Sequence, residues 1–245
     1  MRETPSRKLT VIVHADVVGS TMLVQKDELL AHERIRAAFR ALSETIDRYA
    51  GSTAEIRGDA LASAAKAVAF DHDDSKSQYL LGFLLQLNGR LDEANTHLQR
   101  ALHLNPNDAD SIAATGMHAH ARGRSDDAIN CYLKAIRLNP YHPVWYLWHL
   151  GFAYYNQKSD DKALEVLQEA NSRHPTFMFP RRALAATLAQ LGRIDDASAV
   201  IERIIADQPG ARISQGNVYV IGSGSHRDIW SQHWEADLRK AGLPE

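Results

Sequence analysis

The sequence of 245 residues predicts a mainly α-helical protein in which helical hairpins stack into a solenoid behind a small N-terminal α/β segment. Three observations predict this class: small residues and prolines recur with a period of about 34 residues, glycines separate the helices of most hairpins, and the first residues alternate between strand-like and helix-like stretches. The recurring positions are Gly82, Ala94 and Pro106; Gly116, Ala128 and Pro140; Gly151, Ala163 and Pro175; and Ala185, Ala197 and Pro209. A repeat of this length is typical of helix–turn–helix units that pack on their neighbours.

Each repeat contains the residues that a tight hairpin needs. The small residue of the first helix lets the second helix approach closely. Gly89, Gly123 and Gly192 lie in the expected turns and suit the left-handed residue that ends a helix. An acidic residue or serine follows each turn, and we expect it to cap the next helix. The sequence therefore predicts paired antiparallel helices over residues 60–210.

On these residues, the repeats resemble tetratricopeptide repeats. The resemblance implies a right-handed superhelix whose first helices line a groove that holds a segment of a partner protein. The groove residues it implies include six aromatic side chains: Tyr79, Phe83, Trp145, Trp148, Phe152 and Tyr155. The last four are spaced by three or four residues and share one side of a helix. They either contact a partner or pack against a neighbouring repeat or the C-terminal segment.

Composition limits the classes of function. A formal net charge of −2 argues against a dedicated nucleic-acid surface. Cys131 is the single cysteine, which excludes an internal disulfide framework and fits a reducing compartment. No apolar run reaches the length of about 18 residues that a membrane span needs, and the N-terminus lacks the apolar core of a signal peptide. We therefore expect a cytoplasmic protein.

Residues 1–59 have a different pattern. Leu9–Val18 is β-branched and apolar and predicts a buried strand, and Ser52–Arg57 is a second candidate strand. Asp16 lies inside the first strand, where a carboxylate is costly unless it is paired or binds a cation. Asp59 follows the second strand. If the strands pair, the two carboxylates meet and suit Mg²⁺ bound with nucleotide phosphates; alternatively, Asp16 ends its strand and hydrogen-bonds the following turn.

Residues 7–21 and 51–61 resemble the start of a class III adenylate/guanylate cyclase domain. The resemblance implies that Asp16 and Asp59 bind the metal. It also implies that the turn of Gly19, Ser20 and Thr21 lies beside the triphosphate. The reaction of that family converts ATP or GTP to a 3′,5′-cyclic nucleotide and pyrophosphate.

The cyclase resemblance ends where the helical repeats begin. The later strands, which in that family carry the groups that stabilise the transition state, are missing from this sequence. We therefore expect three regions: a truncated cyclase-like segment at 1–59, helical repeats at 60–210, and a loop with a C-terminal capping helix at 211–245. The expected function is a protein-interaction module without cyclase activity of its own. The alternative is a nucleotide cyclase that acts with a complete cyclase domain as its partner.

Overall fold

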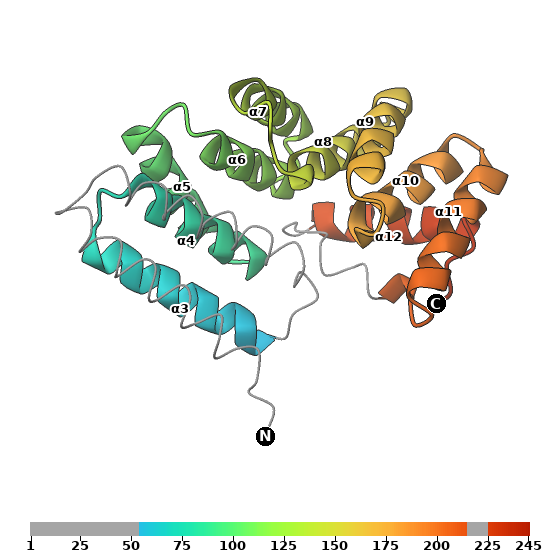
Figure 1. The fold of residues 1–245 in the computed structure, drawn as a ribbon, viewed down its shortest axis with the longest axis horizontal. Helices are drawn as coiled ribbons and strands as arrows, with labels where there is room; N and C mark the ends of the chain where they lie inside the picture. The colour runs from blue at the N-terminus through green and yellow to red at the C-terminus, as the bar shows by residue number, and fades with distance from the viewer. Residues whose placement is uncertain (1–53, 215–224) are drawn as a thin grey trace. The chain divides into compact units, whose positions relative to one another are not determined.

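The computed structural model describes residues 54–214 and 225–245, and the side chains of residues 60–214 and 232–245. These described residues form ten α-helices and no strand (Figure 1). They divide into two compact units, Met1–Asn105 and Pro106–Glu245. The mainly helical class predicted from the sequence is confirmed for this part of the chain.

The described part of the first unit consists of three helices. Helix α3 (Ala54–Phe70) packs against α4 (Ser75–Leu87), and α4 forms a hairpin with α5 (Leu91–Leu104). The Asp74 carboxylate caps α4 by accepting a 2.8 Å hydrogen bond from the backbone N–H of Ser77. An acidic cap of this kind satisfies donors that the first helical turn leaves unpaired.

Helix α3 corrects one expectation and confirms another. The candidate strand at 52–57 is wrong over residues 54–57, because α3 already begins at Ala54. The alanine-rich sequence that follows is a strong helix former and extends the helix toward the N-terminus. The helix expected from Ala60 onward is present. Asp59 lies within α3 rather than in a turn after a strand, whereas Asp16, Gly19, Ser20 and Thr21 lie outside the described residues.

The second unit contains three consecutive hairpins and a C-terminal helix. Its helices are α6 (Ala109–Ala121), α7 (Ser125–Leu138), α8 (Val144–Asn156), α9 (Asp160–Arg173), α10 (Met178–Gln190), α11 (Ile194–Asp207) and α12 (Ser225–Lys240). Within the unit, α7 packs against α8 and α9 against α10, so each hairpin covers the next. α12 packs mainly against α10. α12 lies in the region, residues 211–245, where the sequence predicts a C-terminal helix.

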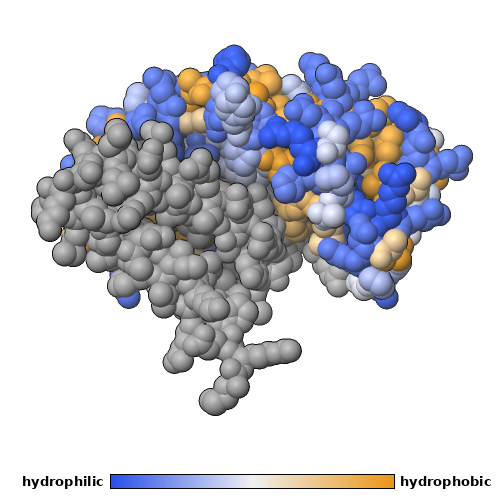
Figure 2. Space-filling model, viewed as in Figure 1, coloured by the Kyte–Doolittle hydropathy of each residue, from blue (hydrophilic) through white to orange (hydrophobic). Residues whose placement is uncertain are grey.

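The first and second helices of the hairpins differ in how many of their residues are buried. Most residues of α8 and α10 are buried, whereas α9 buries only Ala163, Leu167 and Ala170. The second helices thus carry the polar outer surface. In the view of Figure 2 the described residues are mostly hydrophilic, with smaller hydrophobic patches between them.

The small residues act as the sequence predicts. A Cβ atom added to Gly151 would lie 2.5 Å from Leu167 Cγ, and one added to Gly82 would lie 2.8 Å from Leu98 Cγ. Real Cβ atoms do not approach carbon so closely, so glycine is required for the two helices of these two hairpins to touch.

Three of the four hairpin turns contain the left-handed glycine that the sequence predicts, and the remaining turn adopts the same conformation without a glycine. Gly89, Gly123 and Gly192 have φ values of 74°, 78° and 74°. In the third repeat Lys158 adopts the same left-handed conformation, with φ of 61°. In α5, α7 and α11 the expected capping residue is wrong: the acidic residues lie inside the first turn, where their negative charge interacts favourably with the positive end of the helix dipole. In α9 the expected Ser159 occupies the N-cap position, but its side chain makes no capping hydrogen bond.

Candidate functional site

The candidate site is the side of α8 and α10 against which α12 packs. We call it the inner face and define it by Trp148, Phe152 and Tyr155 on α8 and by Phe179 and Arg182 on α10. All five residues are buried. The sequence places its aromatic members three or four residues apart, so each helix presents them as one stripe.

The aromatic residues of α8 pack inside the chain. The Trp148 ring lies 5.2 Å from Phe179 of α10, centroid to centroid. Phe152 and Tyr155 meet the Trp234 ring of α12 edge to face, at centroid distances of 5.2 and 5.9 Å. Such edge-to-face pairs add to the free energy of burying apolar area. The structure therefore shows the intramolecular packing that the sequence left as one of two alternatives.

Three residues predicted for the groove remain. Trp145 is also buried, and its ring packs edge to face on Tyr146 at a centroid distance of 4.5 Å. Tyr79 and Phe83 belong to α4 in the first unit, where their ring centroids lie 6.0 Å apart. These residues are placed on first helices as expected, and their contact with a partner stays a prediction.

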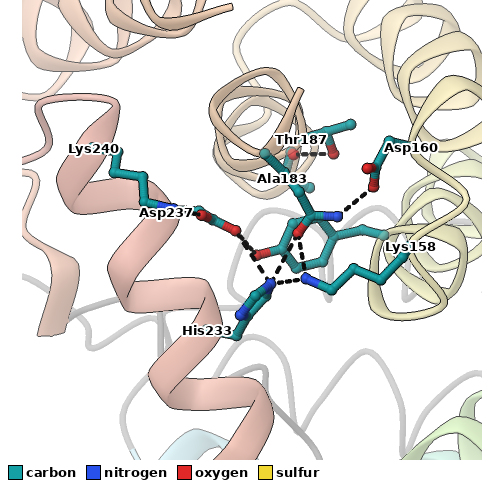
Figure 3. A network of polar contacts seen from close by, with 9 residues as sticks. Lys158, Asp160, Ala183, Thr187, His233, Asp237 and Lys240 are labelled. Carbon is teal, nitrogen blue, oxygen red and sulfur yellow. Dashed lines mark hydrogen bonds and ion pairs between the residues drawn. The ribbon is translucent and has the colours of Figure 1, made fainter. Parts of the chain in front are cut away.

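A polar network fixes α12 on the inner face (Figure 3). Its centre is Asp237, a carboxylate that is 1% exposed. The Tyr155 hydroxyl donates a 2.7 Å hydrogen bond to one oxygen of Asp237, and the Lys240 ammonium donates a 2.9 Å bond to the other. Burial, together with the hydrogen bond to Asp237, raises the pKa of Tyr155 well above its ordinary value, so this hydroxyl acts as a donor at neutral pH.

The network continues to the turn after α8. His233 of α12 lies 3.6 Å from Asp237 and 3.0 Å from the side-chain oxygen of Gln190 on α10. Lys158 contacts His233 and donates a 2.9 Å bond to Gln190. Figure 3 shows His233 and Asp237 of α12 on the side of that helix that faces Lys158, from the turn after α8. Both helices of the inner face are thus tied to α12.

Arg182, unlike the polar side chains of this network, has no hydrogen-bond partner for its guanidinium among the described residues. Its side chain is 0% exposed, and none of its three guanidinium nitrogens has a hydrogen-bond partner in residues 54–214 and 225–245. Burial lowers the pKa of this guanidinium. The neighbouring Arg181, by contrast, makes a 2.5 Å ion pair with Asp207 of α11. The Trp234 indole nitrogen is likewise buried without a hydrogen-bond acceptor in the described part of the chain.

Two buried histidines lie beside the inner face. Burial lowers the pKa of His120 to about 4 and that of His149 to about 3, with a further contribution at His149 from His120. The Asn156 amide lies 2.9 Å from His120 Nε2 and donates to it when that nitrogen is unprotonated. Both imidazoles are therefore neutral at physiological pH.

Metal binding by the predicted aspartate pair stays a prediction. Within the described ranges no three His, Cys, Asp or Glu side chains come together in a way that would hold a metal ion. Asp16 lies outside those ranges, and the side chain of Asp59 is not among those described. In the same part of the chain, no helix has the length and apolar character needed to cross a bilayer.

Family models of the tetratricopeptide repeat match residues 75–108, 119–158 and 161–215, which together make up just over half of the chain. This chain is a tetratricopeptide-repeat protein. The first match covers the hairpin α4–α5, the second covers α7 and α8 with the last residues of α6, and the third covers α9, α10 and α11. No cyclase model is among the matches, so the cyclase relationship of residues 1–59 stays a prediction.

The tetratricopeptide-repeat protein is similar to "Tetratricopeptide repeat-containing protein trd-1" of Caenorhabditis elegans. The two are 30% identical over 115 residues, which cover 45% of this chain and 15% of the worm protein. This chain thus spans about 15% of the length of that curated relative.

Solved structures share the fold. YrrB, described as "a TPR protein with an unusual peptide-binding site", has a TM-score of 0.51 and 19% identity, over 73% of this chain and 90% of YrrB. PilW, a type IV pilus biogenesis factor, gives a TM-score of 0.59 and 18% identity, over 81% of this chain and 90% of PilW. The anaphase-promoting complex assembly Cut9–Hcn1 gives 0.61 and 18%, over 88% of this chain and 46% of that chain. At these identities the likeness shows the fold alone.

Proposed function

We propose that this tetratricopeptide-repeat protein is an interaction module that binds a helical segment of a partner protein on its inner face. One observation carries the proposal: the inner face already holds a helix, α12, by aromatic contacts and a buried polar network. A surface that accepts one amphipathic helix has the shape and chemistry to accept another. The peptide-binding site named for YrrB supports the same use of the fold.

The aromatic side chains would supply most of the binding free energy. Interfaces of this kind depend on a few buried aromatic anchors, and other contacts contribute little. Trp148 packs against the Phe179 ring and Phe152 against the Tyr155 ring, so binding would cost these side chains little conformational entropy. In the first unit, Tyr79 and Phe83 are proposed to contact the partner in the same way.

Affinity capture with the full-length chain tests this function. We expect a partner whose recovery falls at least about tenfold, or 1.4 kcal/mol, with Phe152→Ala. Tyr141→Ala is the matched control, because Tyr141 is an aromatic residue that is 95% exposed outside the inner face. Helix content from circular dichroism checks that both variants are folded. Recovery of every captured protein at wild-type level by Phe152→Ala would contradict the proposal.

For residues 1–59 we propose a fragment of a class III nucleotide cyclase that has no activity of its own. The sequence around Asp16, with Gly19, Ser20 and Thr21, supports this proposal. The metal it would hold is Mg²⁺, a hard cation that carboxylates prefer. The absence of the later cyclase strands from the sequence argues against turnover, because charge stabilisation by such donors is usually the largest catalytic contribution. The cytoplasm, where ATP and GTP are available, is the proposed location.

Incubation of the purified chain with ATP or GTP and Mg²⁺ or Mn²⁺ tests the fragment. We expect no cyclic nucleotide above the level of a blank without protein. The alternative is a cyclase that works only with a complete cyclase domain. Turnover that requires such a domain and disappears with Asp16→Ala would favour that alternative.

A further inference from the structure

Arg182 lies on the inner face because of its place on α10. Phe179, Arg182 and Gln190 fall on one side of this helix at spacings of three and eight residues. Phe179 contacts Trp148 of α8, and Gln190 contacts His233 of α12. The guanidinium of Arg182 therefore belongs to the stripe of α10 that meets both α8 and α12.

No acceptor in the described residues satisfies this guanidinium. It is fully buried, and Nε and both terminal nitrogens lack hydrogen-bond partners there. A buried unpaired charge is among the most destabilising features of a protein interior. Among the α12 carboxylates whose side chains are described, Asp237 is the buried one, and its two oxygens accept from Tyr155 and Lys240. α12 packs mainly against α10, and its buried carboxylate does not pair with Arg182.

We propose that Arg182 receives a carboxylate from the partner, and that the partner is an acidic amphipathic helix which takes the place of α12 on the inner face. This inference rests on the proposed function of that face. A guanidinium binds a carboxylate through two parallel hydrogen bonds, which specify an acidic side chain as well as strengthen binding. α12 then competes with the partner for the inner face from within the same chain. The apparent affinity for the partner falls because the partner can bind only during the fraction of time that α12 is released.

The first test concerns the protein alone. Arg182→Met keeps the length of the side chain and removes the unpaired charge, so the melting temperature is expected to rise, by about 2–4 °C for a gain of each kcal/mol. Arg181→Met is the matched control: it breaks the ion pair with Asp207 and is expected not to raise the melting temperature. A melting temperature of Arg182→Met below that of the wild type overturns the inference.

The second test uses three labelled peptides as long as α12. Each keeps the apolar residues of α12 and has glutamate, glutamine or lysine at every other position. Fluorescence anisotropy with the full chain is expected to show the glutamate peptide binding at least about tenfold more tightly than the glutamine peptide, with the lysine peptide weakest. Arg182→Met is expected to abolish the preference for glutamate, and Arg181→Met to preserve it.

Competition with α12 gives an independent reading. Asp237→Ala removes the carboxylate that Tyr155 and Lys240 hold, so α12 is released more often and the glutamate peptide is expected to bind several-fold more tightly. Equal affinity in wild type and Asp237→Ala overturns displacement of α12. Equal preference for glutamate in wild type and Arg182→Met overturns the role of Arg182. Failure of all three peptides to bind overturns this inference. The proposed function is then still decided separately, by the capture experiment with Phe152→Ala.

Discussion

The Tyr155 hydroxyl of α8 donates a 2.7 Å hydrogen bond to the Asp237 carboxylate of α12, across 82 residues of sequence. Both side chains are almost fully buried. A carboxylate in such a place requires specific partners, so the bond permits few alternative positions of α12 on the inner face. The aromatic contacts of Trp234 bury apolar surface, whereas this hydrogen bond fixes the register of α12 on the inner face.

Tyr155→Phe is predicted to lower the free energy of unfolding by about 1.5–3 kcal/mol, the range for a hydrogen bond to a charged group. The change leaves the ring contacts in place and removes one donor from buried Asp237. Urea denaturation followed by circular dichroism measures the effect. Tyr132→Phe is the control, because the buried Tyr132 hydroxyl has no hydrogen-bond partner in the described residues. A larger loss with Tyr132→Phe than with Tyr155→Phe would contradict this account.

Gly151→Ala is predicted to destabilise the third repeat by about 1–3 kcal/mol, the usual cost of overpacking. The added methyl would lie 2.5 Å from Leu167 Cγ, so α8 and α9 would have to separate. Gly210→Ala is a matched control, because an added Cβ there meets no described atom within 4 Å. Thermal unfolding of both variants measures the difference. Equal melting temperatures for the two would show that the hairpin adjusts without cost.

The hairpins could be predicted from the sequence because their determinants are local. Gly151 on α8 and Leu167 on α9 are separated by a single interhelical turn. The helical period then fixes which residues of the two helices face each other. The third turn shows the limit of this reasoning: Lys158 takes the left-handed conformation without being glycine. There the packing of α8 on α9 fixes the turn geometry, and it overrides the preference of the residue.

The position of α12 could not be predicted, because its partners are distant in sequence. Trp234 and Asp237 are three residues apart and indicate one buried side of a helix. Nothing in their spacing says that this side meets Tyr155 rather than the end of the last hairpin. For the same reason, the stripe of aromatic residues on α8 was compatible with both a free groove and internal packing.

Arg182 illustrates a second limit. Its register on α10 is readable from the repeat, and its place on the inner face follows from that register. Its lack of a hydrogen-bond acceptor in the described residues is a property of the folded chain. A sequence pattern can place a charge on a face, but it cannot say whether the opposite surface satisfies that charge.

Acid is predicted to destabilise the second unit through His120 and His149. Burial lowers the pKa of the first to about 4 and of the second to about 3 in the folded chain, against about 6.5 when unfolded. The unfolded chain therefore binds more protons below neutral pH. The stability from keeping these rings neutral is complete above about pH 6.5 and declines as pH falls toward the folded values, by roughly 2 kcal/mol per histidine at about pH 5.

His149→Phe separates this effect from general acid denaturation. Phenylalanine preserves an aromatic ring beside Trp148, whose centroid lies 4.1 Å from that of His149, and it cannot take up a proton. We expect the loss of unfolding free energy between pH 7 and about pH 5 to shrink by roughly half. If His149→Phe left the pH dependence unchanged, the buried rings would not be the groups that take up protons on unfolding, and this account of the acid sensitivity would be wrong.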